Sequence, residues 1–403
     1  MTGPTDYDTM CKLVQDCTLP AMFVDLDAFD WNAHRFIDIA RRADKTIRIA
    51  SKSLRVPALL RRFQELAGDI AQGVMCYSVA EAAFLAGEGF DDLLVAYPHV
   101  QPQDVHVAAK LNKDASITLM VDCAEHVDLL ATYLEQSPAA ELQVCIDVDA
   151  SLKKFGQHLG AQRSPVRDIA ALKTLLKKVQ QSPRLTAVGA MTYEAQVAGL
   201  ADSVPGQAIK NAIIRKIKDS SMSWLKQYRR EIREAFEAED IAMTLFNGGG
   251  SGSFSQTAED QSLTEITVGS GLLQSHLFDH FEANSCEPAL FFALPITRIP
   301  EPGLVTCHSG GFIASGSPGL DRQPSVHQPA GVRVESREGF GEVQTPLRIP
   351  DSIRNKLHIG DPVFFRPAKA GEIAERFVEY HLFRDGELVD KVKTYRGLGQ
   401  CFF

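Results

Sequence analysis

Thr46-Ile-Arg-Ile-Ala-Ser-Lys-Ser-Leu-Arg55 joins a short strand to a lysine and then to a helical pattern that starts near Pro57. In α/β folds, ligands bind at the carboxyl ends of parallel strands, which is where Lys52 falls. Apolar neighbours would disfavour the charged amine and lower its pKa, as a nucleophilic lysine requires. The alternative is a surface lysine at the start of a helix.

Around this stretch the chain alternates strand-like and helical segments, which predicts parallel strand pairing. The expected strands are Thr46–Ala50, Ile70–Val74, Asp92–Ala96, Ile117–Val121, Gln143–Val148, Leu185–Met191, Met243–Phe246 and Thr264–Val268. Eight such strands within roughly 220 residues fit a closed (β/α)8 barrel better than an open sheet. A long polar helix, Gln207–Ala238, is expected in one crossover.

The composition of the sequence changes after about residue 283, where proline, glycine and strand-like segments dominate. Expected strands include Phe291–Arg298, Pro362–Arg366 and Glu387–Tyr395, and Asp385-Gly386 is typical of a hairpin turn. The sequence therefore predicts an α/β barrel domain over residues 28–282. An all-β domain follows over residues 283–403, and residues 1–27 are expected to join it.

Composition excludes several classes of protein. The formal net charge is -9, so nothing suggests nucleic-acid binding. No apolar run approaches the ~18 residues of a membrane span, and the N-terminus lacks the pattern of a secretory signal. The eight cysteines have no CxxC or metal-type spacing, which predicts the reduced thiols of a cytoplasmic protein.

A second chemical signal is Asn247-Gly-Gly-Gly-Ser-Gly-Ser253, directly after the seventh expected strand. Glycines let backbone N–H groups approach a ligand without interference from β-carbons. A helix starting near Ser253 or Ser255 would add its positive end. Gly269-Ser270-Gly271 follows the eighth strand, and the loops after strands seven and eight of such barrels commonly hold phosphate. Simple turns are the alternative.

These features occur in an order that resembles a known family. The residues are Pro20-Ala-Met-Phe-Val-Asp-Leu-Asp27, Asn32, Lys52, Tyr77-Ser-Val-Ala-Glu-Ala82, Gly189-Ala-Met-Thr-Tyr-Glu194 and the glycine loop. They resemble the fold type III pyridoxal 5′-phosphate enzymes, and within them the D-threonine aldolase and D-serine dehydratase branch of amino acid deaminases and aldolases. The resemblance covers nearly the whole chain. It implies an alanine-racemase-type barrel with a C-terminal β domain, a homodimer, pyridoxal phosphate and an amino acid substrate.

The resemblance also assigns roles. Lys52 would bond covalently to the cofactor and then move protons. Tyr193 would lie near the cofactor, with an interface aromatic as the alternative. The cofactor and its phosphate would be held by Asn247, Gly249, Gly250, Ser251, Gly252, Gly269 and Ser270.

Further charged residues follow other strands. Arg55 is expected as a charge on a helix surface, with a contact to the cofactor as the alternative. Asp147 and Asp149 are site candidates that could instead cap a turn. Where relatives place an arginine near the cofactor, this chain offers Lys153, Lys154 or Arg163.

The β domain departs from the family. Relatives carry a His followed two residues later by Cys or Asp, which bind a divalent metal near the substrate hydroxyl. Here the stretch is Phe364-Phe-Arg-Pro-Ala-Lys-Ala-Gly-Glu372, which has neither ligand, so no metal ligands are predicted. We expect the Lys369 ammonium to take roughly the metal's place, with Glu372 setting its charge. A surface turn is the alternative.

The resemblance implies a lyase that acts on a β-hydroxy amino acid, expected to be the D form, by retro-aldol cleavage or by dehydration and deamination. The alternatives are an amino acid racemase, a non-catalytic pyridoxal-phosphate-binding protein and a barrel for phosphorylated metabolites. His99 and His308 are expected to be structural. Glu342 and Gln344 could border the site of a partner subunit.

Overall fold

The computed structural model describes residues 6–135, 141–154, 156–283 and 285–403. Eight parallel strands close into a barrel in the order β10-β11-β2-β3-β4-β5-β6-β9. Their bounds are β2 Thr46–Ala50, β3 Ala71–Cys76, β4 Leu93–Pro98, β5 Ile117–Val121, β6 Leu142–Asp147, β9 Leu185–Thr192, β10 Leu245–Gly248 and β11 Glu265–Val268. The predicted barrel is confirmed, and two strands, Thr46–Ala50 and Ile117–Val121, have the predicted bounds.

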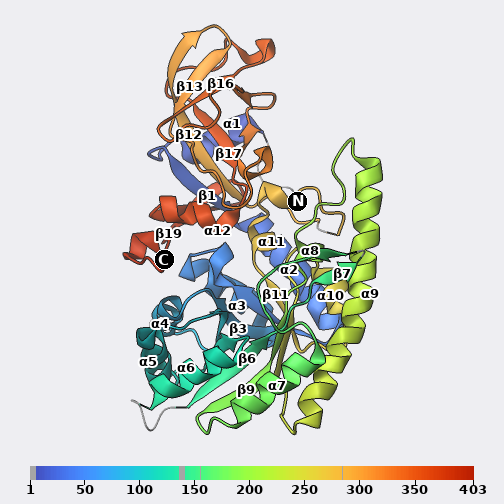
Figure 1. Ribbon diagram of the computed structural model, residues 1–403. Helices are drawn as coiled ribbons and strands as arrows, with labels where there is room; N and C mark the ends of the chain where they lie inside the picture. Colours follow the sequence, from blue (N-terminus) through green and yellow to red (C-terminus); the bar gives the residue numbers. More distant parts are fainter. Residues whose placement is uncertain (1–5, 136–140, 155, 284) are drawn as a thin grey trace.

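Helices cover the outside of the barrel (Figure 1). They are α2 Leu26–Arg42, α3 Pro57–Ala67, α4 Val79–Gly87, α5 Pro102–Leu111, α6 Ala124–Leu134, α7 Ile169–Gln180, α8 Ala195–Ala198, α9 Ala208–Ala238, α10 Phe254–Ala258 and α11 Ser270–Leu273. The long helix α9 lies along one side of the barrel, as the polar crossover predicted. One feature was missed, the short hairpin of β7 Leu152–Lys154 and β8 Gln157–Leu159.

Side chains on β2 alternate between two environments. Ile47 and Ile49 are fully buried against the surrounding helices, whereas Ala50 belongs to the cluster that fills the barrel interior. Because successive side chains of a strand point to opposite faces, Arg48 lies inside the barrel with Ala50. The same alternation directs Lys52, just beyond the strand, toward the barrel mouth.

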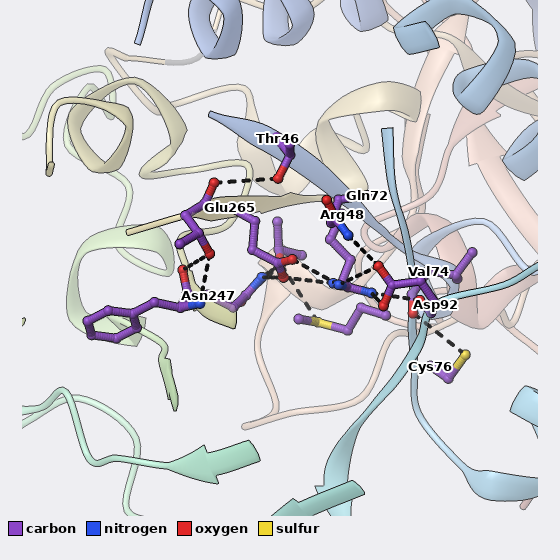
Figure 2. A network of polar contacts seen from close by, with 12 residues as sticks. Thr46, Arg48, Gln72, Val74, Cys76, Asp92, Asn247 and Glu265 are labelled. Carbon is purple, nitrogen blue, oxygen red and sulfur yellow. Dashed lines mark hydrogen bonds and ion pairs between the residues drawn. The ribbon is translucent and has the colours of Figure 1, made fainter. Parts of the chain in front are cut away.

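Arg48 organises a charged layer inside the barrel (Figure 2). Its guanidinium pairs with Glu265 at 2.7 Å and with Asp92 at 3.1 Å. The amide of Asn247 donates to Glu265 at 2.7 Å and to Thr267 at 2.8 Å. Burial alone would lower the pKa of Arg48, but the two carboxylates outweigh it and raise the pKa. This network ties β2, β10, β11 and the start of β4 to one another inside the barrel.

Nine other strands form a second sheet above the barrel, in the order β15-β16-β13-β12-β1-β18-β19, with β17 pairing β12 and β14 (Figure 1). The bounds are β1 Ala21–Asp25, β12 Leu290–Glu301, β13 Leu304–His308, β14 Ser325–Gln328, β15 Arg333–Val334, β16 Gln344–Arg348, β17 Pro362–Arg366, β18 Glu379–Arg384 and β19 Glu387–Lys393. Two helices accompany it, α1 Tyr7–Val14 and α12 Ala370–Ile373.

The N-terminal strand belongs to this sheet. β1 pairs antiparallel with β12 and parallel with β18. The limits expected from sequence, 28–282 and 283–403, stay predictions. Asp385 and Gly386 both have positive φ, as the expected hairpin turn between β18 and β19 requires. None of the helices described is long and apolar enough for a membrane span.

Candidate active site

A cavity of about 700 Å³ opens where the barrel strands end and the second sheet begins. Its lining combines residues from most barrel strands with a turn of the C-terminal region. The predicted site residues on its wall are Lys52, Tyr193, Asn247, Gly249, Gly250, Ser251, Gly269, Ser270 and Lys369. Gly252 does not line the cavity, because its backbone packs against the carbonyl group of Ala198.

Lys52 projects into this cavity and donates a hydrogen bond to the phenol oxygen of Tyr97 at 2.8 Å. Burial lowers the pKa of Lys52, as expected, but Tyr97 opposes this effect and the net pKa is raised. The expected low pKa is therefore wrong for the protein as it stands. Tyr97 follows a bulge near the end of β4, so its side-chain direction could not be read from strand alternation.

The glycine turn after β10 exposes bare backbone to the cavity. Gly249 has φ of +84°, and a β-carbon there would lie 2.7 Å from Ile266 Cγ2, so only glycine fits. The backbone N–H groups of Gly250 and Ser251 donate no hydrogen bond to any described part of the chain. The Ser251 hydroxyl accepts from the N–H of Gly271 at 2.8 Å and so ties the two glycine turns together. Helix α10 begins at Phe254, as predicted.

A buried ion-pair network holds this turn from behind. Glu194 accepts from the N–H of Gly249 at 3.2 Å and from the Ser253 hydroxyl at 2.9 Å. Arg229 of α9 pairs with Glu194 at 2.7 Å and with Asp260 at 3.2 Å, and its side chain is completely buried. Glu194 is the last residue of the Gly189–Glu194 motif, but nothing in the sequence marked Arg229 as its partner.

Asp122, Asp147 and Arg163 line the part of the cavity wall that follows β5 and β6. Burial raises the pKa of Asp147 to about 7, with a further contribution from the charge of Asp122. The charge of Arg163 acts in the opposite direction on Asp147. Of the basic residues predicted near the cofactor, Arg163 lines the cavity. Lys153 is exposed and does not line it. Nothing is described of the side chain of Lys154.

One expectation for a charged residue needs correction, and that for Asp149 holds in both of its forms. Arg55 is not a charge on a helix surface: it is buried, lines the cavity and pairs with Glu375 at 2.8 Å. Asp149 also lines the cavity, but it caps the following turn by accepting from the N–H of Ser151 at 2.9 Å. Its other oxygen lies 3.1 Å from Arg167.

Tyr193 follows β9 at the cavity wall, and burial raises its pKa. Its ring approaches the backbone of Gly250, where a β-carbon would lie 3.3 Å from the ring edge. Tyr193 therefore sits between the lysine strand and the glycine turn. His99 and His308 lie outside the cavity lining, and His99 contacts the Tyr97 carbonyl group at 2.9 Å.

One set of metal-ligand type occurs within the described ranges. Ligand atoms of Asp122, Cys123 and His126 lie within 4.8 Å of one another. Asp122 and His126 line the cavity, and their side chains are 3.1 Å apart. The C-terminal turn contributes Lys369 and Glu372 to the opposite side of the same cavity.

Comparisons with known proteins agree with this arrangement. The chain matches the family described as alanine racemase, N-terminal domain, over residues 24–274. It is 25% identical to 3-hydroxy-D-aspartate aldolase of Paracoccus denitrificans, covering 82% of this chain and 83% of that protein. It is 24% identical to D-threonine aldolase of an Arthrobacter species, covering 86% of each.

A solved structure extends the likeness to the second sheet. The crystal structure of D-threonine aldolase from Filomicrobium marinum superposes with a TM-score of 0.81 at 20% sequence identity, covering 95% of this chain and 96% of that one. The family match spans the barrel, including Lys52 and both glycine turns. The resemblance drawn from the sequence is confirmed, and the chain belongs to the alanine racemase N-terminal domain family.

Proposed function

We propose that this protein is a pyridoxal 5′-phosphate-dependent lyase that acts on a D-β-hydroxy amino acid, by retro-aldol cleavage or by dehydration and deamination. The observation that carries the proposal is that the Lys52 amine and both glycine turns open into one cavity. The curated relatives named above are aldolases of D-β-hydroxy amino acids, which supports this substrate class.

The residues present fit the cofactor. The cavity of about 700 Å³ has room for pyridoxal phosphate together with a small amino acid. The free N–H groups of Gly250 and Ser251, with the Ser270 hydroxyl nearby, are donors suited to a phosphate. Lys52 would bond the cofactor. When bound, the cofactor supplies an electron sink for the Cα carbon of an amino acid.

Each of several residues of the chain has its own role in the reaction. Lys52 accepts and returns the proton at Cα, because its amine is the reactive nitrogen at the end of β2. Tyr193 and Asn247 line the cavity and would contact the cofactor, and Arg163 would supply positive charge for an anionic group. The Glu194–Arg229 pair keeps the glycine turn in place. A homodimer and a cytoplasmic location, both suggested by the sequence, complete the proposal, and light scattering would establish the oligomeric state.

Borohydride reduction of the cofactor-loaded protein, followed by peptide mass spectrometry, tests the cofactor and its lysine. The adduct is expected on Lys52 and is lost in Lys52→Ala, whereas the exposed lysine variant Lys110→Ala retains it. An adduct that persists in Lys52→Ala would refute the assignment. Assays of D- and L-β-hydroxy amino acids that measure aldehyde, glycine, keto acid and ammonia separately then test the reaction.

A further inference from the structure

A second amine, that of Lys369, reaches the cavity from the C-terminal region. Lys369 follows β17 and immediately precedes α12. The turn packs directly on the segment that carries the first amine, because a β-carbon at Gly371 would overlap the carbonyl oxygen of Lys52. Lys369 is therefore part of the wall around Lys52, not a surface residue of a separate domain.

Lys369, Ser315 and Glu372 form a closed cluster of hydrogen bonds. The Lys369 ammonium donates to the Ser315 hydroxyl at 3.0 Å and lies 2.9 Å from a Glu372 oxygen. Glu372 accepts from the backbone N–H of Ser315 at 2.7 Å and from its hydroxyl at 2.8 Å. Each member touches the other two, so the flexible lysine is held in one place.

The charges in this cluster define what Lys369 can do. Burial tends to raise the pKa of Glu372, but the hydrogen bonds from Ser315 and the charge of Lys369 outweigh it, so the pKa is lowered. Glu372 is therefore a carboxylate at neutral pH, and one of its oxygens forms an ion pair with the Lys369 ammonium. An ammonium has three donors and no acceptor, so it can give a proton but cannot take one.

We propose that Lys369 is the catalytic acid that protonates the departing β-hydroxyl group, so that this site dehydrates its substrate and does not cleave it. The inference rests on the proposed function and narrows it. Retro-aldol cleavage needs a base to remove the hydroxyl proton, whereas loss of the hydroxyl needs an acid. Lys369 offers only the acid. Ser315 and Glu372 are positioning residues that hold the ammonium in place.

The elimination balances without any further reactant. Lys52 takes the Cα proton, the Cβ–O bond breaks, and the oxygen leaves as water with a proton from Lys369. A double bond forms between Cα and Cβ. The released enamine takes up one water, giving a keto acid and ammonia. Proton exchange with solvent returns both lysines to their starting states.

The experiment uses cofactor-loaded protein with D-serine and D-alanine, which differ only in the β-hydroxyl group. The variants are Lys369→Met, Ser315→Ala and, as a control, the exposed Lys356→Met. Turnover of D-serine is measured as keto acid, ammonia, aldehyde and glycine. Exchange of the D-alanine Cα proton with deuterated solvent is followed by NMR, because that step needs Lys52 but not an acid at the hydroxyl.

We expect the parent protein to give keto acid and ammonia in equal amounts and to keep this activity with a chelator present. Lys369→Met should lose about 10²–10⁴-fold in kcat for D-serine, the usual size of acid catalysis, while D-alanine exchange stays unchanged. Ser315→Ala should lose less and shift the alkaline limb of the pH profile, the limb on which an acid catalyst is lost. Lys356→Met should match the parent for both measurements.

Several results would overturn the inference. They are glycine and aldehyde as the main products, net conversion to the L amino acid, or equal loss of elimination and exchange in Lys369→Met. Loss of activity on chelation with recovery on adding zinc or manganese would also overturn it and point to the Asp122, Cys123 and His126 set. Failure of the loaded protein to form any reducible adduct would instead refute the proposed function itself.

Discussion

The Lys52 amine donates a hydrogen bond to the phenol oxygen of Tyr97 at 2.8 Å, and the same ring lies 5.5 Å below the amine. Burial and Tyr97 act on the pKa of Lys52 in opposite directions, and the tyrosine prevails. The reactive amine is thus more basic than its position in the barrel alone would make it. Tyr97 therefore lowers the fraction of Lys52 that is neutral at a given pH.

Replacing Tyr97 by Phe should lower the pKa of Lys52, because the largest effect that opposes burial is removed. The folded protein would form its reducible cofactor adduct at lower pH than the parent does. The measurement is the pH dependence of the rate of adduct formation, with Tyr133→Phe as a control on an outer helix. An unchanged pH dependence would show that Tyr97 does not tune the amine.

Arg229 is the central cation behind the glycine turn. Arg229→Leu leaves Glu194 and Asp260 buried without their partner, and breaking buried pairs in this way costs about 3–5 kcal/mol in free energy of unfolding. Denaturant titration measures this loss. Its neighbour Arg230 is exposed, so Arg230→Leu should change stability by at most about 0.5 kcal/mol. Equal effects in the two variants would contradict the role of the network.

Glu81 couples stability to pH. It is fully buried, accepts from the N–H of Tyr77 at 2.7 Å and from the Tyr395 hydroxyl at 2.8 Å, and burial raises its pKa from 4.5 to about 7. The folded protein therefore keeps this proton over a pH range in which the unfolded chain has lost it. The stability contribution is fully present below pH 4.5 and is lost as pH rises to about 7.

Glu81→Gln should remove this pH dependence, which amounts to about 3 kcal/mol between the two limits. The free energy of unfolding is compared at about pH 5 and about pH 8 in the parent and the variant. Glu65→Gln on an exposed helix position is the matched control and should leave the dependence intact. A parent whose stability is flat over this range would rule out the protonated Glu81.

Gly371→Ala tests the contact between the two regions. The new β-carbon would overlap the Lys52 carbonyl oxygen, so the turn carrying Lys369 must move, at a cost of about 1–3 kcal/mol. We expect keto acid formation to fall more than D-alanine exchange does. Gly87→Ala, where a β-carbon meets nothing within 4 Å, should behave like the parent. Parallel loss of both activities would mean that the turn only supports Lys52.

The barrel could be predicted because its signal is local. Each strand is a short apolar run between helical segments, and Lys52 and the glycine turns follow their strands directly in sequence. Several residues of the site have no such signal. Tyr97 depends on a bulge, and the partnership of Glu194 with Arg229 joins β9 to a helix that contacts it only in the folded chain.

The C-terminal region was harder to predict for the same reason. Its strands β13, β14 and β16 were not expected, because short strands of an antiparallel sheet are selected by distant partners more than by their own sequences. Lys369 and Glu372 could be proposed from their spacing, but Ser315 belongs to a loop more than fifty residues earlier, at a separation of 54 from Lys369. Only the fold brings them together.

The pairing of β1 with both β12 and β18 has a consequence for synthesis on the ribosome. β1 is translated before both of its partners: β12 follows only after the whole barrel, and β18 follows later still. The barrel and its Lys52 can close in the meantime. The turn with Lys369 is translated after the whole barrel, so a nascent chain carries the amine of Lys52 well before that of Lys369.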